Sequence, residues 1–274
     1  MSGPIQRPSP GCATGLRGLL ALMLAVLAGC AAAPAGGALE DLKTSSDQTD
    51  ADKRARVRME LAAGYFSRGQ PATALDEVKL ALAVRPDLPE AFNLRGLIYA
   101  AMGEARLAEE SFKRGQQLAP RDADMMHNYA WFLCQSSRFA EADTLFLQAL
   151  AQPQYRDVVR TLMARGVCLA RAQRWQEAEA VLTRAYEFDP GNPVSGFHLS
   201  ELLFRRGEFE RARFYIRRVL QTREFATPQS LWLAVRLERR LGDAQAMQGW
   251  GQQLQERFPR SPETLMYDKG RFDE

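Results

Sequence analysis

The chain repeats a pattern of helix signals with a period of about 34 residues. Proline, which cannot continue a helix, recurs at Pro86, Pro120, Pro190 and Pro259, at intervals of about one or two periods. Small residues keep almost the same period, at Ala74, Ala108, Ala142 and Ala178. A period of this length with two helices in each unit indicates a stack of helical hairpins. We therefore expect an all-α chain that grows by stacking units, without a single globular core.

Within a unit, small and large residues occupy fixed places. Gly96 is paired with Ala108, where the two helices of a hairpin approach closely, and Phe112 fills the space between helices. Gln154 stands where the third unit would have its proline, and extra residues there shift the phase. Ser261, followed by proline and glutamate, has the chemistry of a helix start.

These features are typical of tetratricopeptide (TPR) repeats. The sequence predicts an all-α fold, a right-handed TPR superhelix of six helix-turn-helix repeats with a short C-terminal capping helix. We place this domain at residues 55–274.

The N-terminus has a different character. Arg7 and Arg17 precede an apolar run over residues 19–28, which has the length of a secretory signal core and is short for a membrane span. The run ends in Leu-Ala-Gly-Cys at residues 27–30, which resembles the lipobox of bacterial lipoproteins. The resemblance implies removal of residues 1–29 and lipidation of Cys30. An ordinary signal peptide, cut a few residues later, is the alternative.

Residues 30–54 are rich in Ala, Gly, Ser, Thr and Asp, so we expect a lipidated N-terminus followed by a flexible tether. Ala31 follows the cysteine, and not the aspartate that often retains lipoproteins at the inner membrane. The expected location is therefore the periplasmic face of the outer membrane, with a lipid anchor.

The composition excludes several other classes of function. Lys plus Arg number 36 and Asp plus Glu number 33, and the basic residues are spread along the chain, so we expect no nucleic-acid partner. His127 and His198 lack cysteine or carboxylate neighbours at metal-ligand spacing. No phosphate-binding loop or nucleophile elbow is present. We expect no enzyme activity, no metal and no cofactor apart from the covalent lipid, in a monomer.

Cys134 and Cys168 fall at nearly equivalent points of the first helices of the third and fourth units. In an oxidising compartment they could form a disulfide, provided that their Cα atoms lie within about 7 Å. Two buried free thiols are the alternative, and the sequence leaves both open.

A concave face lined by first-helix positions is expected to bind a partner segment. The predicted partner-binding groove contains Phe66, Asn93, Leu97, Asn128, Trp131, Met163 and Phe197. Further residues expected on this face are Met59, His127, Cys134, Val167 and Phe204. Such an apolar face fits an extended or helical peptide. Alternatively, neighbouring repeats cover some of these side chains, Trp131 above all.

The fifth unit is basic. Its arginines are Arg205, Arg206, Arg211, Arg213, Arg217, Arg218 and Arg223. This could be a solvated face, or a site for an acidic partner or lipid headgroups.

One segment carries a more specific resemblance. Residues 127–134, His-Asn-Tyr-Ala-Trp-Phe-Leu-Cys, closely resemble the Asn-Asn-Tyr-Gly-Trp-Phe-Leu-Cys motif of the type IV pilus biogenesis and stability lipoproteins, the PilF/PilW family. The similarity continues through residues 207–215, 231–236 and 258–263. This chain departs from the motif at His127 and Ala130.

The resemblance implies an outer-membrane pilotin that promotes localisation and multimerisation of the type IV pilus secretin. Asn128, Trp131 and Cys134 are the motif residues that it marks as important. A TPR lipoprotein that serves another envelope machine, such as outer-membrane protein assembly or cell-wall synthase activation, is the alternative with the same fold and anchor.

Overall fold

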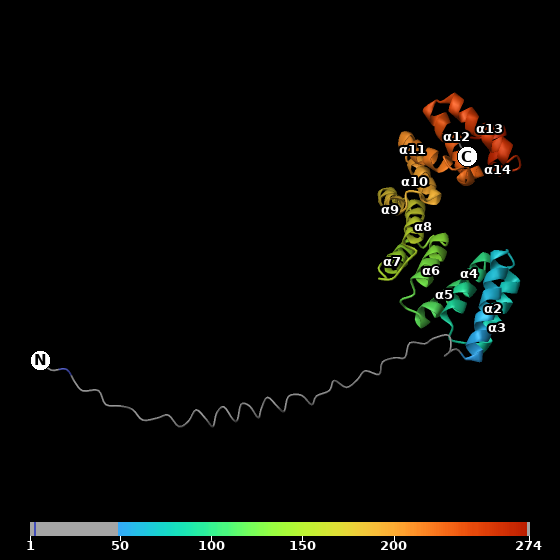
Figure 1. The fold of residues 1–274 in the computed structure, drawn as a ribbon, viewed down its shortest axis with the longest axis vertical. Helices are drawn as coiled ribbons and strands as arrows, with labels where there is room; N and C mark the ends of the chain where they lie inside the picture. The colour runs from blue at the N-terminus through green and yellow to red at the C-terminus, as the bar shows by residue number, and fades with distance from the viewer. Residues whose placement is uncertain (1–2, 4–48, 273–274) are drawn as a thin grey trace, which may run out of the picture. The chain divides into compact units, whose positions relative to one another are not determined.

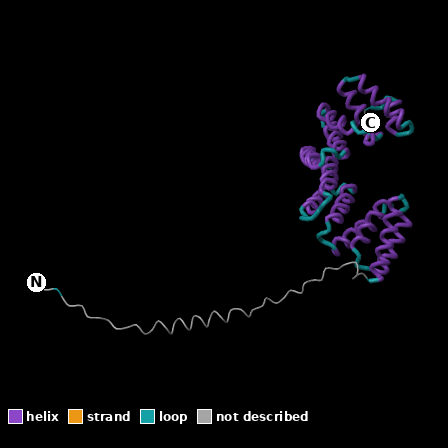
Figure 2. The backbone as a smooth tube through the Cα atoms, in the orientation of Figure 1, coloured by secondary structure: helices purple, strands orange, loops and turns teal. Residues whose placement is uncertain are grey.

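The computed structural model describes Gly3 and residues 49–272, and all its described helices belong to the unit that begins at Thr49. In this part of the chain the structure is helical, without strands (Figures 1 and 2). The first three hairpins are α2 (Asp50–Ser67) with α3 (Pro71–Val84), α4 (Pro89–Ala101) with α5 (Ala105–Leu118), and α6 (Ala123–Gln135) with α7 (Phe139–Leu150). The next three are α8 (Val158–Arg171) with α9 (Trp175–Phe188), α10 (Pro193–Arg205) with α11 (Phe209–Leu220), and α12 (Pro228–Leu241) with α13 (Ala244–Arg257).

A single short helix, α14 (Pro262–Asp268), follows the sixth hairpin. It begins where the sequence predicts, because the hydroxyl of Ser261 accepts a hydrogen bond from the backbone N–H of Thr264 at 3.1 Å. The aromatic rings of Trp232 and Phe272 stack at 5.6 Å where the chain folds back on α12. The prediction of an all-α TPR fold with six hairpins and a capping helix is confirmed.

The first helix begins earlier than predicted. The side chain of Thr49 accepts a hydrogen bond from the N–H of Asp52, and the carboxylate of Asp52 accepts one from the N–H of Thr49. This reciprocal cap starts α2 at Asp50. The boundary of the tether at residue 54 is therefore wrong, since residues 50–54 are helical. The predicted signal peptide, Cys30 and the tether up to residue 48 lie outside the described residues.

All six hairpins turn in the same way. Each has one residue with a positive φ angle between its two helices, namely Gly69, Gly103, Ser137, Gln173, Gly207 and Gly242. The next N–H then bonds to the carbonyl five residues back, as Arg174 does to Leu169 at 2.9 Å. This shared turn explains why the helix signals recur with so regular a period. Two of the six positions carry a side chain in the left-handed region, where glycine is favoured.

Small residues let the paired helices approach. A Cβ atom added to Gly96 would lie 2.7 Å from Cε1 of Phe112, and one added to Gly166 would lie 2.5 Å from Cγ of Leu182. Ala108 is completely buried. The close approach predicted at Gly96 is therefore present, and the ring of Phe112 is what occupies the space.

The hairpins stack in chain order. Successive first helices contact one another from α2 to α12, and each second helix contacts the first helix of the next hairpin. Among the described helices, successive second helices have no contact of comparable extent. One face of the stack is therefore formed by first helices side by side. Two connections are long, residues 151–157, where the sequence predicts the shift in phase, and residues 221–227, which contain the 3-10 helix η2 (Arg223–Phe225).

Candidate functional site

The seven residues of the predicted groove all lie on first helices, from α2 to α10, and all are half-buried. The five apolar ones, Phe66, Leu97, Trp131, Met163 and Phe197, pack partly against the core clusters of the stack. The same side chains therefore support the core and expose part of their surface on one face. Their role in binding a partner stays a prediction.

Polar contacts join these residues across the hairpins. The amide nitrogen of Asn128 donates to the amide oxygen of Asn93 at 3.1 Å, which links α6 to α4. The guanidinium of Arg171 lies 5.3 Å from the ring centroid of Trp131, a cation–π distance. Trp131 is thus packed against the core and covered in part by an arginine, and it remains half-exposed.

Two other residues expected on this face are buried. His127 is 7% exposed and Cys134 is 1% exposed, so their assignment to the groove lining is wrong. Both side chains point toward the adjacent first helix, α8. Nδ1 of His127 lies 2.8 Å from the hydroxyl oxygen of Thr161, which in turn lies 2.5 Å from the hydroxyl of Tyr155. Burial, together with the positive charge of Arg160, lowers the pKa of His127 to about 4.

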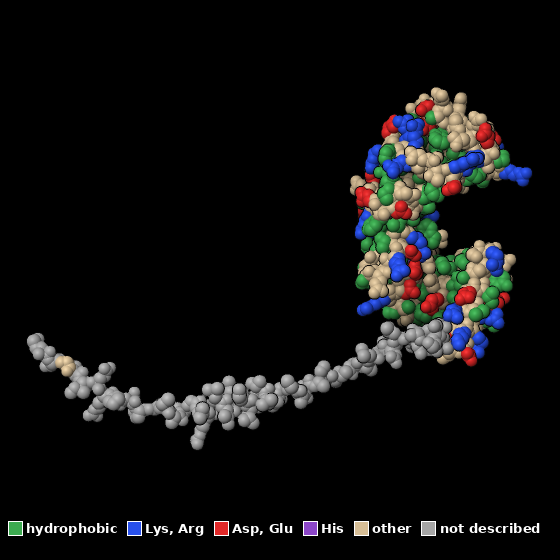
Figure 3. Space-filling model, in the orientation of Figure 1, with side chains coloured by type: hydrophobic (Ala, Val, Ile, Leu, Met, Phe, Trp, Pro, Cys, Tyr) green, Lys and Arg blue, Asp and Glu red, His purple; other side chains and the backbone are tan. Residues whose placement is uncertain are grey.

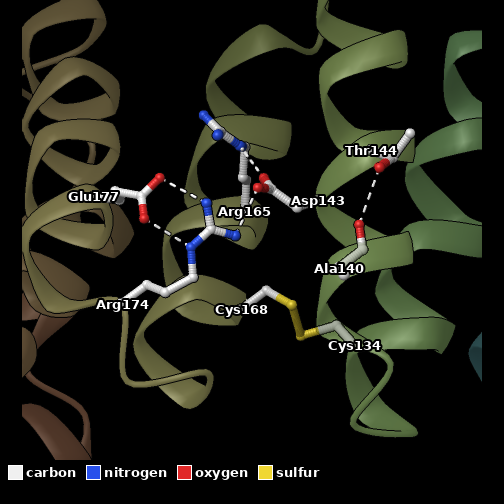
Figure 4. A network of polar contacts seen from close by, with 8 residues as sticks. All are labelled: Cys134, Ala140, Asp143, Thr144, Arg165, Cys168, Arg174 and Glu177. Atoms are coloured by element: carbon white, nitrogen blue, oxygen red, sulfur yellow. Dashed lines mark hydrogen bonds and ion pairs between the residues drawn. A yellow bond between two sulfur atoms is a disulfide. The ribbon is translucent and has the colours of Figure 1, made fainter.

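The structure joins Cys134 of α6 to Cys168 of α8 in a disulfide, with their Cα atoms 5.8 Å apart (Figure 4). This separation lies within the range of protein disulfides. Both sulfur atoms belong to buried residues at the contact between the third and fourth hairpins.

A charged network crosses the same contact (Figure 4). Asp143 of α7 accepts hydrogen bonds from Nε of Arg165 at 2.6 Å and from Nη1 of Arg174 at 2.8 Å. Arg174 also donates twice to Glu177, at 2.7 and 2.6 Å. Burial raises the pKa of Asp143, but the two arginines outweigh it and bring the pKa below its usual value. The disulfide, the His127 contact and the charged network together hold the third hairpin to the fourth.

Three neighbouring cavities lie between the fourth and fifth hairpins and between the fifth and sixth hairpins. A cavity of about 400 Å³ lies among α10, α12 and α14. Its lining residues are Phe197, Glu201, Phe204, Arg205, Gln229, Trp232, Leu233, Arg236, Glu263 and Met266. A second cavity of about 330 Å³ shares Phe197 and Gln229 with it, and a third of about 160 Å³ shares Glu201 and Arg205.

Of the seven predicted groove residues, only Phe197 lines these three cavities of the described chain. Sequence reasoning missed Trp232 and Glu263, because they belong to the sixth hairpin and the capping helix, where the repeat pattern is weakest. A helix start after Ser261 was the signal available for this segment, and it does not indicate which helices the segment meets.

The basic fifth hairpin is largely neutralised by its own neighbours. Arg206 and Arg211 pair with Glu179, and Arg213 and Arg217 pair with the buried Glu238. Charged side chains of both signs are interspersed on the surface in Figure 3. This pattern favours a solvated face over a dedicated anionic-ligand site.

Two features concern the described residues as a whole, Gly3 and residues 49–272. In this part of the chain, no group of three or more His, Cys, Asp or Glu side chains is arranged to hold a metal ion. Within the same residues, no helix is both long and apolar enough to span a bilayer.

Comparison with known proteins gives a consistent result. Family models described as tetratricopeptide repeat match residues 89–122, 133–193 and 169–229. The type IV pilus assembly protein PilF of Pseudomonas aeruginosa (strain PAO1) is 25% identical over 249 residues, which cover 90% of this chain and 96% of PilF.

Solved structures agree with this. The crystal structure of PilW, described as a widely conserved type IV pilus biogenesis factor, has a TM-score of 0.72 and 28% identity, and covers 78% of this chain and 97% of its own. A structure of P. aeruginosa PilF has a TM-score of 0.68 and 22% identity, and covers 81% of this chain and 100% of its own; this second likeness concerns the fold.

Proposed function

Because the chain is a tetratricopeptide repeat protein related to the type IV pilus proteins PilF and PilW, we propose that it is a pilotin for the pilus secretin. In this proposal it binds a segment of the secretin and promotes the localisation and multimerisation of that protein in the outer membrane. Its role is binding, without catalysis.

The observation that carries the proposal is the first-helix face. Leu97, Trp131 and Phe197 are half-buried on the second, third and fifth hairpins, and each is packed against the core beneath it. An extended peptide that binds across such a face could bury its apolar side chains against these residues. Core packing already fixes the conformation of the face residues, so binding would cost little ordering of them. The disulfide and the Asp143 network fix the central part of the face, because both cross the contact between α6 and α7 on one side and α8 on the other.

The sequence of the N-terminus completes the proposal. A lipid on Cys30 would hold the protein at the periplasmic face of the outer membrane, and the residues up to 48 would tether the repeats to it. The acyl chains of a bacterial lipoprotein anchor firmly because each buried methylene contributes about 0.8 kcal/mol.

Charge placed on the face tests the function. Trp131→Glu and Leu97→Glu should lower the amount of secretin multimer in the envelope, measured by semi-denaturing gel electrophoresis, while the level and membrane fraction of the lipoprotein stay unchanged. Leu147→Glu is the matched control, since Leu147 is 48% exposed on a second helix. Unaltered multimers in both variants would contradict the proposal.

A pull-down from detergent-solubilised outer membranes tests the identity of the partner. We expect the secretin to co-purify, and a Cys30→Ala variant separates anchoring from binding. Recovery of an outer-membrane assembly or cell-wall synthase complex without a secretin would instead support the second function, service to another envelope machine.

A further inference from the structure

Glu263 holds an unusual position at the cavity among α10, α12 and α14. It is 8% exposed and lines the cavity. Its Oε1 atom accepts a hydrogen bond from the amide nitrogen of Gln229 at 2.8 Å. Its Oε2 atom is buried and has no hydrogen-bond partner among the described residues. Buried carboxylates are normally paired, because an unpaired charge away from water is costly.

The cations that line the cavity are already engaged. Nη2 of Arg205 donates to Glu201 at 2.7 Å. Nε of Arg236 donates to the carbonyl of Phe272 at 2.9 Å, and its guanidinium lies 4.7 Å from the ring centroid of Phe204. Among the buried carboxylate oxygens of these lining residues, Oε2 of Glu263 is therefore the acceptor that lacks a donor.

The rest of the lining is apolar. Phe197 and Phe204 of α10, Trp232 of α12 and Met266 of α14 supply aromatic and thioether surface. A ligand that fits both parts has a long apolar stem and a cationic end. Lysine and arginine side chains have this form, and they commonly bury the stem while the charged end finds a polar partner.

We propose that this cavity binds a lysine or arginine side chain of an extended partner segment, whose head group donates a hydrogen bond to the carboxylate of Glu263 once that side chain turns Oε2 toward the cavity. The stem lies against Phe197, Phe204 and Met266. This deepens the proposed function and rests on it in one respect, since it assumes that a partner segment lies along the first-helix face. It identifies the chemistry of one residue in that segment.

The test uses peptides, so that it does not involve the secretin. A phage-displayed library of random heptapeptides is selected against the full-length protein in detergent, and in parallel against Glu263→Gln and Glu256→Gln. Glu256 is an exposed residue of α13 and serves as the matched control. We expect a basic residue flanked by apolar residues to be enriched on the parent and on Glu256→Gln, and this enrichment to be absent on Glu263→Gln.

A second measurement changes the peptide. Replacing the selected lysine by methionine in a synthetic peptide should weaken binding to the parent protein by about tenfold or more, the size expected for one charge-assisted hydrogen bond. The same replacement should have little effect on binding to Glu263→Gln. Fluorescence anisotropy reports both, and circular dichroism confirms that the variant is folded.

Several outcomes would overturn the inference: no selected peptides, peptides without a basic position, or equal enrichment on Glu263→Gln. Failure of the inference and failure of the proposed function are distinguishable. If a secretin co-purifies but the peptides show no basic preference, only the inference fails. If the preference is found but another envelope complex co-purifies, only the secretin assignment fails.

Discussion

Nδ1 of His127 and the hydroxyl oxygen of Thr161 lie 2.8 Å apart, and the two residues are separated by 34 positions in the chain. The disulfide partners Cys134 and Cys168 have the same separation. One repeat period therefore places equivalent positions of neighbouring first helices next to each other. The period that defines the hairpins also determines which side chains can meet between them.

The buried histidine predicts a pH dependence of stability. The pKa of His127 is about 4 in the folded protein and 6.5 in the reference state, so the unfolded chain binds more protons between these values. Its contribution to stability is complete above pH 6.5 and is lost as the pH falls toward 4. The loss amounts to about 3 kcal/mol. Urea unfolding at several pH values measures it.

His127→Gln is the control for this effect, because glutamine can still bond to Thr161 but does not titrate in this range. Its unfolding free energy should change less between pH 7 and pH 4.5 than that of the parent. Equal changes in the two proteins would show that other groups cause the dependence.

The disulfide predicts a large stability difference on reduction. It closes a loop of 34 residues, and loop-closure entropy for that length corresponds to about 4 kcal/mol. Cys134→Ala with Cys168→Ala should lower the free energy of unfolding by an amount of this order. Non-reducing mass spectrometry checks the bond directly: two alkylatable thiols in the unreduced periplasmic protein would contradict it.

Replacing two helical glycines by alanine should change the free energy of unfolding in opposite directions. Gly96→Ala places a Cβ against the buried ring of Phe112, so we expect a loss of about 1 to 3 kcal/mol from overpacking. Gly249→Ala meets no atom within 4 Å and should add about 0.5 to 1 kcal/mol through better helix propensity. Thermal and urea unfolding measure both; unchanged or higher stability in Gly96→Ala, or a loss of stability in Gly249→Ala, would contradict the expectation for that position.

The hairpin turns provide a further pair of substitutions with opposite expected effects on stability. Gln173 has a φ of 61° and Gly207 a φ of 79° at equivalent turn positions. Gly207→Gln should cost about 1 kcal/mol, because a side chain is strained in the left-handed region. Gln173→Gly should leave stability unchanged or raise it. A loss of stability in Gln173→Gly would mean that the glutamine side chain makes a contact that outweighs the strain.

The architecture was predictable because its signals are local. Prolines, turn residues and small residues such as Ala108 act within one hairpin, so their period gave the number of hairpins, and the capping serine gave the last helix. The resemblance to the pilus proteins is likewise a property of the sequence, and the similarity of the chain to PilF and PilW confirms it. The one boundary error, at α2, arose where Thr49 and Asp52 form a cap within a polar segment.

Contacts between hairpins were not predictable in this way. Two cysteines at equivalent positions left bonded and free states open, and the structure brings their Cα atoms to 5.8 Å. His127 was expected on the exposed face, and the packing of α6 against α8 buries it instead.

By itself the sequence therefore determined the kind of unit and the number of units, since helix starts, turns and close approaches depend on neighbouring residues, and it showed the resemblance to the type IV pilus proteins. Only the tertiary structure decided which half-exposed residues form hollows, and it brought Glu263 of the capping helix into the same cavity as Phe197. These residues are far apart in the chain, and their meeting depends on how the last two hairpins and the cap pack together.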